Sequence, residues 1–435
     1  MAETNPDIQY ANTETIKCWQ EQRLAEELDY LACHSLFYKR LFYEHGINLG
    51  RIKKLEDLRH IPVTTKEDLQ LYNKHFLCVA NGDVADYVTT SGTLGEPVIF
   101  CLTTSDLNRL AYNEKQSFTT AGCMSGDILQ LMTTLDRRFM AGLAYFLGAK
   151  ELGCGVIRVG NGIPELQWDT INRINPTVAI VVPSFLIKLI EYAQKSGIDH
   201  HLSSLKRAVC IGEALRTSDF EFNTLGIQIL EKWPELELFS TYASTEMQTS
   251  FTECRYHLGG HLPPDLIIVE FLDADNQPVG EDEAGEVTIT TLGVRGMPLL
   301  RFKTGDICHH HNEPCRCGRN TTRLSPVLGR KGQMIKYKGT TLYPPALYDI
   351  LDSMKDVKNY IIEVYTNNLG TDEVQILIGS DIRSDAFEKK IKDVFRSKVR
   401  VAPQVVFEST EFISRMQNPP QSRKTVKFID LRTTK

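Results

Sequence analysis

The chain has 435 residues, of which 49 are Lys or Arg and 55 are Asp or Glu, so its formal net charge is −6. A hydrophobic fraction of 42% and a charged fraction of 24% are ordinary for a globular protein and argue against a disordered chain or a coiled coil. Mild acidity argues against nucleic-acid binding, and without a run of about 20 apolar residues or a secretory signal we predict a cytoplasmic protein that does not enter a membrane.

The first segment of the chain is predicted to be helical. Residues 14–45 carry apolar side chains at roughly 3.6-residue spacing among good helix formers, which indicates one long helical stretch. Residues 54–72 mix a short helix with a turn marked by Pro62. Thr65 can cap a helix that begins near Lys66, because its hydroxyl can accept from backbone N–H groups of the first turn.

From about residue 85 the pattern changes to short β-rich runs separated by helical stretches. The runs occupy residues 86–90, 97–101, 128–132, 155–160, 178–183 and 207–212, and a helical pattern at 214–226 follows the last of them. Strands that alternate with helices indicate α/β layers around mainly parallel sheets. Residues 265–308 instead contain strands joined by polar turns, which predicts an antiparallel, β-barrel-like subdomain.

The last quarter of the chain has the pattern of a separate module. After the loop-like residues 309–328, the pattern restarts as strand, turn and helix, followed by two strands, a helix and a strand. We therefore predict a large N-terminal domain of layered α/β sheets at 1–329 and a small α+β domain at 330–435. The Gly-rich junction at 329–332 is the candidate linker.

A candidate phosphate-binding loop lies at residues 87–100, YVTTSGTLGEPVIF, where a β-run breaks and then resumes. Its hydroxyls and backbone N–H groups can wrap a polyphosphate, and its two glycines permit a close approach. The segment lacks the Lys-Ser/Thr pair of a P-loop, and a Gly-Thr hairpin turn fits the local sequence about equally well.

Three further segments carry residues suited to a nucleotide site. STYASTEMQTS (240–250) places Tyr242 and Glu246 on a polar loop, where a carboxylate can ligate Mg²⁺. In LLRFKTGDIC (299–308), Asp306 follows a Gly-bearing turn at the end of a strand and can accept from two ribose hydroxyls, although taken alone an ordinary turn Asp is the favoured interpretation. In LGRKGQMIKYKGTTLYPPALYDIL (328–351), Arg330 can reach a ribose or phosphate oxygen and Gly332 can absorb a backbone rotation.

Four residues form a candidate zinc site. Most of the 11 cysteines are isolated in apolar stretches, but Cys254, Cys315 and Cys317 join His261 in a set of three thiolates and one imidazole that can close a tetrahedron. His257 is the alternative imidazole, and unpaired cysteines beside a His-rich loop at 309–311 are the alternative to a metal. Since no ligand position is open, we predict a structural zinc that ties the loop after the Glu246 motif to the loop after the Asp306 motif.

These motifs, in this order, resemble the phenylacetate–CoA ligase family of the adenylate-forming superfamily. TTSGTLGEP resembles its phosphate loop, YASTE, RFKTGD and LGRKGQMIKYKG resemble its later core motifs, and the opening LAEELDYLACHSLFYKRLF resembles its aryl-CoA ligase branch. The resemblance implies that an acid attacks the α-phosphate of ATP to give an acyl-adenylate and pyrophosphate. The small C-terminal domain then rotates, and coenzyme A displaces AMP to form a thioester.

The resemblance also implies a role for individual residues. The expected phosphate ligands are Thr90, Ser91, Gly92, Thr93 and Gly95, the adenine and nucleotide contacts are Gly212, Glu213, Ala214, Tyr242, Ala243, Ser244 and Thr245, and the ribose ligands are Asp306 and Arg330. Glu246 would hold Mg²⁺, Lys424 would be the adenylation lysine with Lys427 as its competitor, and Gly332 would be the hinge. The acid pocket would include Phe139, Met140, Ala141 and Gly142.

We therefore expect an ATP-dependent aryl acid–CoA ligase that acts on phenylacetate or a related aryl acid with Mg²⁺, and that forms a homodimer by family analogy. The alternative is an adenylating enzyme that passes its acyl group to the pantetheine thiol of a carrier protein. A non-catalytic nucleotide-binding protein ranks last, because Glu246, Asp306 and a terminal lysine are all present.

Overall fold

The computed structural model describes residues 4–90, 98–281, 283–367, 371–419 and 425–432. The chain divides into two compact units: unit 1 contains Met1–Thr304 and Cys308–Pro326, and unit 2 contains Gly305–Ile307 and Val327–Lys435. Unit 2 therefore includes a three-residue stretch of an earlier strand as well as the C-terminal segment. Among the described residues, no helix is both long and apolar enough to cross a membrane.

The N-terminal helical segment is broken at Ser35. Two helices, α1 (Thr13–His34) and α2 (Leu36–Glu44), replace the single stretch predicted for residues 14–45. The Ser35 N–H still donates to Leu31 O at the end of α1, while its hydroxyl accepts from the Tyr38 N–H at 3.3 Å at the start of α2. A serine that caps a new helix competes with continuation of the old one, which the apolar spacing alone does not reveal.

The helix cap predicted at Thr65 is confirmed. α3 (Lys66–Leu71) begins directly after it. The Thr65 hydroxyl accepts from the Asp68 N–H at 3.3 Å, and the Asp68 carboxylate accepts from the Thr65 N–H at 2.9 Å. This reciprocal capping box satisfies two backbone donors at the start of the helix. Short 3-10 helices occupy Ile8–Tyr10, Leu49–Arg51, Leu55–His60, Asn73–Phe76, Asn81–Asp83, His200–Leu202 and Lys331–Gln333.

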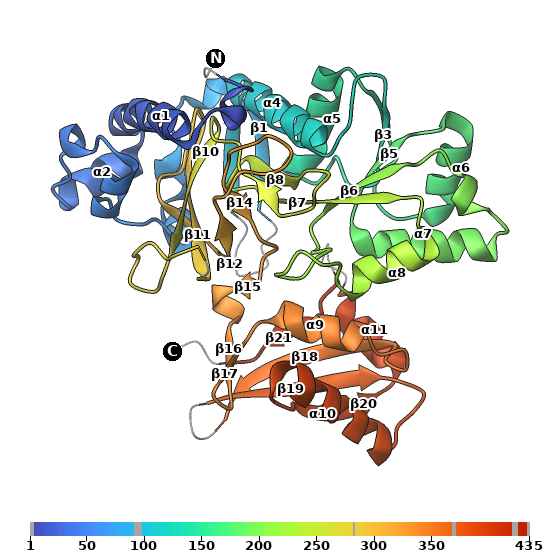
Figure 1. Ribbon diagram of the computed structural model, residues 1–435. Helices are drawn as coiled ribbons and strands as arrows, with labels where there is room; N and C mark the ends of the chain where they lie inside the picture. Colours follow the sequence, from blue (N-terminus) through green and yellow to red (C-terminus); the bar gives the residue numbers. More distant parts are fainter. Residues whose placement is uncertain (1–3, 91–97, 282, 368–370, 420–424, 433–435) are drawn as a thin grey trace. The chain divides into compact units, whose positions relative to one another are not determined.

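Unit 1 is organised around a nine-stranded sheet in the order β13-β14-β9-β8-β7-β6-β5-β3-β4 (Figure 1). The strands are β3 (Ile128–Leu131), β4 (Gly155–Arg158), β5 (Val178–Val181), β6 (Arg207–Ile211), β7 (Glu237–Ser244), β8 (Thr249–Glu253), β9 (Gly260–His261), β13 (His310–His311) and β14 (Arg323–Leu324). From β4 to β7 neighbouring strands are parallel, as predicted, and from β7 onward the pairs are antiparallel.

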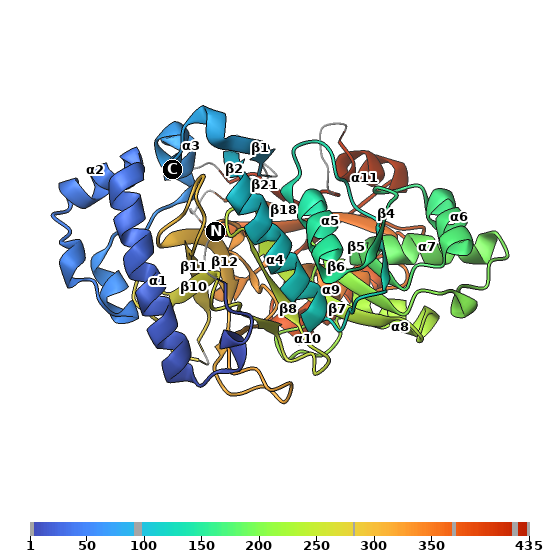
Figure 2. The same cartoon turned by 90° about the horizontal axis from the view of Figure 1, so that it is seen from above.

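Helices cover both faces of the parallel strands (Figure 2). On one face lie α4 (Thr104–Thr120) and α5 (Met140–Leu152), and on the other lie α6 (Pro164–Ile174), α7 (Pro183–Lys195) and α8 (Thr224–Lys232). Within β5, Val178 and Ile180 join the apolar cluster of α4 and α5, whereas Ala179 and Val181 join the cluster of α6, α7 and α8. A strand buried on both faces has a continuous apolar sequence, which explains the run VAIV.

A row of buried polar contacts, which we call the α4–β8 seam, joins α4 to the hairpin of β7 and β8. It consists of Arg109, Asn113 and Ser117 on α4, and of Gln248, Thr249, Ser250 and Thr252 on the hairpin. The helix residues recur every four positions and so lie on one face. Asn113 Oδ1 accepts from the Ser250 N–H at 3.1 Å, and the hydroxyls of Ser117 and Thr252 are 2.6 Å apart.

The helix predicted at residues 214–226 is wrong, because α8 begins only at Thr224. The preceding residues form a tight hairpin in which Arg216 and Phe222 make an isolated antiparallel bridge. Phe220 adopts a φ of 64°, a left-handed conformation that a helix does not contain. Asn223 then caps α8 through its side chain.

The remaining strands include antiparallel pairs: 84–89 pairs with 99–103 in a region that was predicted to form mainly parallel sheets, whereas 267–272 pairs with 285–291, and 302–308 with 329–330, where residues 265–308 were predicted to be antiparallel. β1 (Val84–Thr89) and β2 (Ile99–Thr103) form a hairpin, and β10 (Ile267–Leu272), β11 (Gly285–Thr291), β12 (Phe302–Cys308) and β15 (Gly329–Arg330) form a sheet in that order. β12 pairs with β15 through Asp306 and Ile307, which belong to unit 2.

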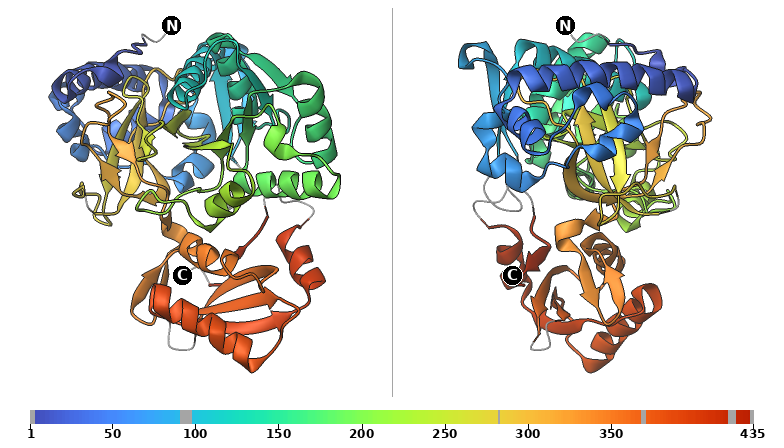
Figure 3. Two further views of the ribbon diagram at one scale, coloured as in Figure 1. Left: turned by 45° about the vertical axis from the view of Figure 1, so that its right-hand side comes forward. Right: turned by 90° about the vertical axis from the view of Figure 1, so that its left-hand side faces the viewer.

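Unit 2 has its own sheet and its own core (Figure 3). The hairpin of β16 (Ile335–Tyr337) and β17 (Thr340–Leu342) precedes a sheet in the order β20-β19-β18-β21. Its elements are α9 (Pro344–Asp352), β18 (Asn359–Thr366), β19 (Asp372–Gly379), α10 (Asp385–Val399), β20 (Gln404–Glu408), α11 (Thr410–Gln417) and β21 (Phe428–Asp430). α11 and β21 were not predicted from the sequence.

Candidate active site

Several of the predicted nucleotide and acid residues of unit 1 follow strands that end at one edge of the central sheet. In a parallel sheet the carboxyl ends of all strands meet at the same edge, which is where ligands bind in α/β proteins. Phe139 to Gly142 follow β3, Gly212 to Ala214 follow β6, and Thr245 and Glu246 follow β7. The topology therefore places three segments, which lie between residues 139 and 246 of the chain, at one edge of the sheet.

The loop after β6 is held by hydrogen bonds on both sides of Ala214. Gly212 has a φ of 76°, which favours glycine at this turn. The Glu213 carboxylate accepts from the Ser184 N–H at 2.9 Å and from the Ser184 hydroxyl at 3.0 Å, so it joins the first turn of α7 to the loop after β6. The Ala214 carbonyl accepts from the Asn223 amide at 2.8 Å. These contacts fix the backbone that would border an adenine ring.

The loop after β7 contains only residues 245–248. Ser244 pairs with Thr249, so Tyr242, Ala243 and Ser244 belong to β7 and not to the polar loop predicted for residues 240–250. The ring of Tyr242 stacks on that of Phe251 with centroids 5.8 Å apart. Glu246 is half-buried within the loop. At the end of the loop, the guanidinium of Arg109 in the α4–β8 seam donates to the Gln248 carbonyl at 2.6 Å.

Of the predicted phosphate ligands, only Thr90 belongs to the described residues. The Thr90 N–H donates to Val98 O, and its hydroxyl accepts from the Val98 N–H, both at 3.0 Å, so residues 90 and 98 close the base of the loop. Ser91, Gly92, Thr93, Gly95 and Lys424 lie outside the described residues.

The predicted acid-pocket segment begins α5. Phe139 is the N-cap residue and Met140 is buried in the first turn. A Cβ on Gly142 would lie 2.1 Å from the Thr134 carbonyl oxygen, so only glycine permits this close approach of helix and loop. The preceding loop is tied to β1, because Arg138 O accepts from the Thr89 N–H at 3.0 Å, one residue before the phosphate loop.

Asp306 and Arg330 meet in unit 2. They are register partners of β12 and β15, and the Arg330 Nε lies 3.1 Å from the Asp306 carboxylate. Asp306 lies within β12 and not at a strand end as predicted; Gly305, with a φ of 79°, bends the strand without ending it. Gly332 lies in a 3-10 helix two residues after Arg330, and a Cβ on it would meet nothing within 4 Å.

The four residues of the candidate metal site lie together. The ligand atoms of Cys254, His261, Cys315 and Cys317 are all within 4.8 Å of one another. The Sγ atoms of Cys254 and Cys315 are 3.7 Å apart, and Cys317 Sγ lies 3.5 Å from His261 Nε2. Cys254 directly follows β8 and His261 lies in β9, so two neighbouring antiparallel strands of the central sheet position these two candidate ligands. His257 points its Nδ1 toward Glu253, at 3.1 Å, and is not among the four.

The environment favours a thiolate at one of these cysteines. Burial alone would raise the pKa of Cys317, but hydrogen bonds with His261 and Arg319 lower it to about 5. Burial raises the pKa of Cys254 to about 12 and lowers the pKa of His261, because it disfavours the charged form of each side chain. A bound cation would offset the cost of a buried thiolate at Cys254. The donor set and its spacing suit a tetrahedral metal ion.

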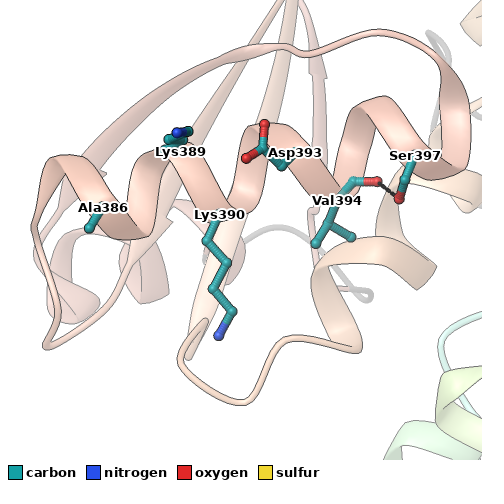
Figure 4. A pocket seen from close by; sticks show the side chains of 6 residues that line it. All are labelled: Ala386, Lys389, Lys390, Asp393, Val394 and Ser397. Atoms are coloured by element: carbon teal, nitrogen blue, oxygen red, sulfur yellow. Dashed lines mark hydrogen bonds between the residues drawn. The ribbon is translucent and has the colours of Figure 1, made fainter.

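An open, shallow surface runs along α10 in unit 2 and is lined by Ala386, Lys389, Lys390, Asp393, Val394 and Ser397 (Figure 4). It is open to solvent, and its lysines are exposed beside an exposed aspartate. None of its lining residues belongs to the predicted site.

Sequence reasoning missed several residues that hold the site in place: Arg109, Ser184, Arg216 and Glu253. Each acts through a contact with a residue far away in sequence, such as Arg109 with Gln248. Polar residues that recur every four positions within a predicted helix, as at Arg109, Asn113 and Ser117, were the available signal, because buried polar groups need partners.

Comparison with known proteins agrees with the motifs. The model of the family described as AMP-binding enzyme matches residues 47–295. The phenylacetate–coenzyme A ligase of Thermus thermophilus is 30% identical over 379 residues, which cover 86% of this chain and 83% of the relative. The phenylacetate–coenzyme A ligase of Escherichia coli is 26% identical over 434 residues, which cover 98% and 97%.

The fold is shared with a solved ligase. The crystal structure of 2-hydroxyisobutyryl-CoA ligase in the postadenylation state, in complex with R3-HIB-AMP, gives a TM-score of 0.84 at 22% identity and covers 98% of this chain and 91% of that one. The chain therefore belongs to the AMP-binding enzyme family and, within it, to the phenylacetate–coenzyme A ligase family.

Proposed function

We propose that this protein joins an aryl acid, phenylacetate or a close relative of it, to coenzyme A. Family membership gives the reaction class, an AMP-forming acid–CoA ligation that uses ATP and passes through an acyl-adenylate. The names of the Thermus and Escherichia coli relatives support an aryl acid. The observation that supports the proposal is that the segments after β3, β6 and β7 follow strands that end at one sheet edge, and these segments carry the residues that we propose for the acid, adenine and Mg²⁺.

The residue roles follow from the chemistry of the first half-reaction. A carboxylate and a triphosphate repel, so positive charge must gather at the α-phosphate and the leaving pyrophosphate. Glu246 is half-buried on the site edge and is the type of carboxylate that Mg²⁺ prefers beside phosphate oxygens. We assign the phosphates to Thr90, Ser91, Gly92, Thr93 and Gly95, the ribose to Asp306 and Arg330, and the acid to Phe139, Met140, Ala141 and Gly142.

The choice of acid is tested with a panel of phenylacetate, benzoate, indoleacetate and short fatty acids. AMP release is measured with ATP, with and without coenzyme A. We expect the aryl acids to give the highest kcat/KM and AMP release to depend on coenzyme A. A preference for fatty acids would contradict the proposed acid, and thioester formation only with a carrier protein would favour the alternative acceptor.

Lys424 is proposed as the adenylation lysine because its competitor is already engaged. The Lys427 ammonium lies 3.1 Å from the Asp352 carboxylate and faces the rings of Tyr348 and Tyr360 at 5.6 and 5.1 Å. Lys424→Ala should abolish pyrophosphate exchange while ATP binding persists, whereas Lys427→Ala, the matched control, should retain most exchange. The reverse result would contradict the assignment.

We propose a structural zinc at Cys254, His261, Cys315 and Cys317. The closeness of the four donor atoms supports it, because three thiolates and an imidazole satisfy zinc without an open position. Metal analysis should find one zinc per chain, lost in Cys315→Ser and retained in Cys154→Ser, a half-buried cysteine outside the cluster. Zinc-free protein with intact thiols would contradict the site.

The domain assignment completes the proposal. Residues 1–329 would form the adenylation core, and residues 330–435 would rotate about Gly332 between the two half-reactions. A homodimer and a cytoplasmic location stay predictions, which sedimentation and cell fractionation test.

A further inference from the structure

Arg216 and Glu253 form a buried ion pair to which the proposed reaction gives no role. Their side chains are 5% and 2% exposed, and the Arg216 Nε lies 3.0 Å from a Glu253 carboxylate oxygen. The net stabilisation by such a pair is often small, because desolvation offsets the attraction, whereas loss of one partner leaves a buried charge. A buried pair of this kind therefore fixes geometry more than it adds stability.

On one side, the pair anchors the loop that would border adenine. Arg216 is two residues after Ala214, its Nη1 donates to Phe220 O at 3.1 Å, and its guanidinium lies 3.9 Å from the ring centroid of Phe222. At the other end of the same loop, Glu213 is fixed by Ser184. The loop is therefore attached at residues 213 and 216, and loss of either attachment frees the backbone between them.

On the other side, the pair is attached to the metal cluster. Glu253 is the last residue of β8 and directly precedes Cys254. Its second carboxylate oxygen accepts from the Ser240 N–H at 2.7 Å and lies 3.1 Å from His257 Nδ1. The backbone of Cys254 is therefore continuous with that of the residue whose carboxylate holds Arg216.

We propose that Arg216 and Glu253 are positioning residues that couple the Cys254–His261–Cys315–Cys317 cluster to the nucleotide loop, so that a metal ion in the cluster raises the affinity for ATP. A bound ion would hold Cys254 by a short, directional bond, and the ion pair would pass that restraint to residues 212–216. Thiols without an ion can separate, and the loop would then pay an ordering cost when ATP binds. The inference rests on the proposed nucleotide site and the proposed metal.

The test measures ATP binding and turnover separately. Arg216→Gln, Glu253→Gln and the control Arg207→Gln are compared with the wild type by calorimetry with ATP and by pyrophosphate exchange. Arg207 serves as the control because it pairs with Glu237 at 3.2 Å across β6 and β7, at the end of β6 opposite to the loop that contains Arg216. We expect Arg216→Gln and Glu253→Gln to raise the Kd and KM for ATP about tenfold with kcat within about twofold of the wild type, and the control to change neither.

The coupling is tested by removing the metal with a chelator. Chelation should raise the Kd of the wild type for ATP by a similar factor and should raise that of Arg216→Gln no further, because both changes break one connection. The inference would be overturned if chelation raised the Kd for ATP of Arg216→Gln by the same factor as that of the wild type. It would also be overturned by an unchanged Kd in Arg216→Gln or by wild-type protein that holds no metal. Arg216→Lys, which keeps the charge, serves in place of Arg216→Gln if circular dichroism shows that the glutamine variant is unfolded.

Failure of the inference can be told apart from failure of the proposed function. If the wild type neither binds ATP nor exchanges pyrophosphate with any acid of the panel, the proposed function fails. If the wild type does both and the variants match it, only the coupling fails.

Discussion

Glu27 should make the protein less stable as the pH rises from about 4.5 to 7. Its side chain is buried in α1, with 3% of the residue exposed. The Gly293 N–H donates to one carboxylate oxygen at 3.2 Å, and the other oxygen has no hydrogen-bond partner among the described residues. Burial raises the pKa of Glu27 from 4.5 to about 7, although Arg295 and Arg109 oppose the shift, while Asp106 adds to it.

The sign and size of the effect follow from this pKa. The folded protein holds the Glu27 proton more tightly than the unfolded chain does. Protonation of Glu27 therefore contributes its full stabilising free energy below pH 4.5, and this contribution is lost as the pH rises toward 7. A shift of roughly 2.5 units corresponds to roughly 3 kcal/mol. Glu114 changes stability in the same direction, because burial raises its pKa to about 8, so a single variant is needed to isolate Glu27.

Glu27→Gln provides that variant, because its amide oxygen can keep the hydrogen bond from Gly293 without a charge. We expect the variant to match the wild type at pH 5 and to exceed it at pH 8 by up to about 3 kcal/mol in free energy of unfolding, measured by urea denaturation. A wild-type-to-variant difference that is the same at both pH values within about 0.5 kcal/mol would refute the reasoning.

Three other perturbations test the hinge, the ribose site and a helix cap. Gly332→Pro should slow thioester formation more than adenylation, whereas Gly332→Ala should be tolerated because a Cβ meets nothing within 4 Å; equal loss in both half-reactions would contradict a hinge. Asp306→Asn should raise the KM for ATP by roughly tenfold to a hundredfold if Asp306 binds ribose as proposed, since the amide would weaken charge-assisted hydrogen bonds. Circular dichroism should show little unfolding, because Arg330 is 40% exposed and can be hydrated. Thr65→Ala should lower the free energy of unfolding by about 1 kcal/mol through loss of the capping box, and Thr65→Ser should restore it.

Features set by nearby residues could be predicted from the sequence. The Thr65 cap needs only Asp68 three residues later, and the double burial of β5 follows from an uninterrupted apolar run. The proximity of Cys254, His261, Cys315 and Cys317 could also be predicted, although the residues are up to 63 positions apart. Two short segments that together carry three cysteines and a histidine are typical of zinc sites and have few other uses. Residue type was decisive in these cases, and distant context was not.

Features that depend on tertiary contacts could not be predicted. Residues 214–226 have helical spacing, yet the bridge of Arg216 to Phe222 and the buried partner Glu253 stabilise a hairpin there. Ser35 ends one helix and caps the next, which apolar periodicity does not show. β21 is short and pairs in parallel with a strand more than sixty residues earlier, so its sequence alone carries a weak signal.

The α4–β8 seam has a consequence for any attempt to change which acid the protein accepts. Apolar side chains can slide past one another at small cost, but paired hydrogen bonds between Asn113 and Ser250, and between Ser117 and Thr252, are lost together when a helix moves by a single residue. The support beneath residues 245–248 therefore has one alignment only. Substitutions at Phe139 or Met140 leave that alignment intact. A substitution at Arg109 would remove its hydrogen bond to the Gln248 carbonyl and so displace the loop at residues 245–248 in every redesigned variant.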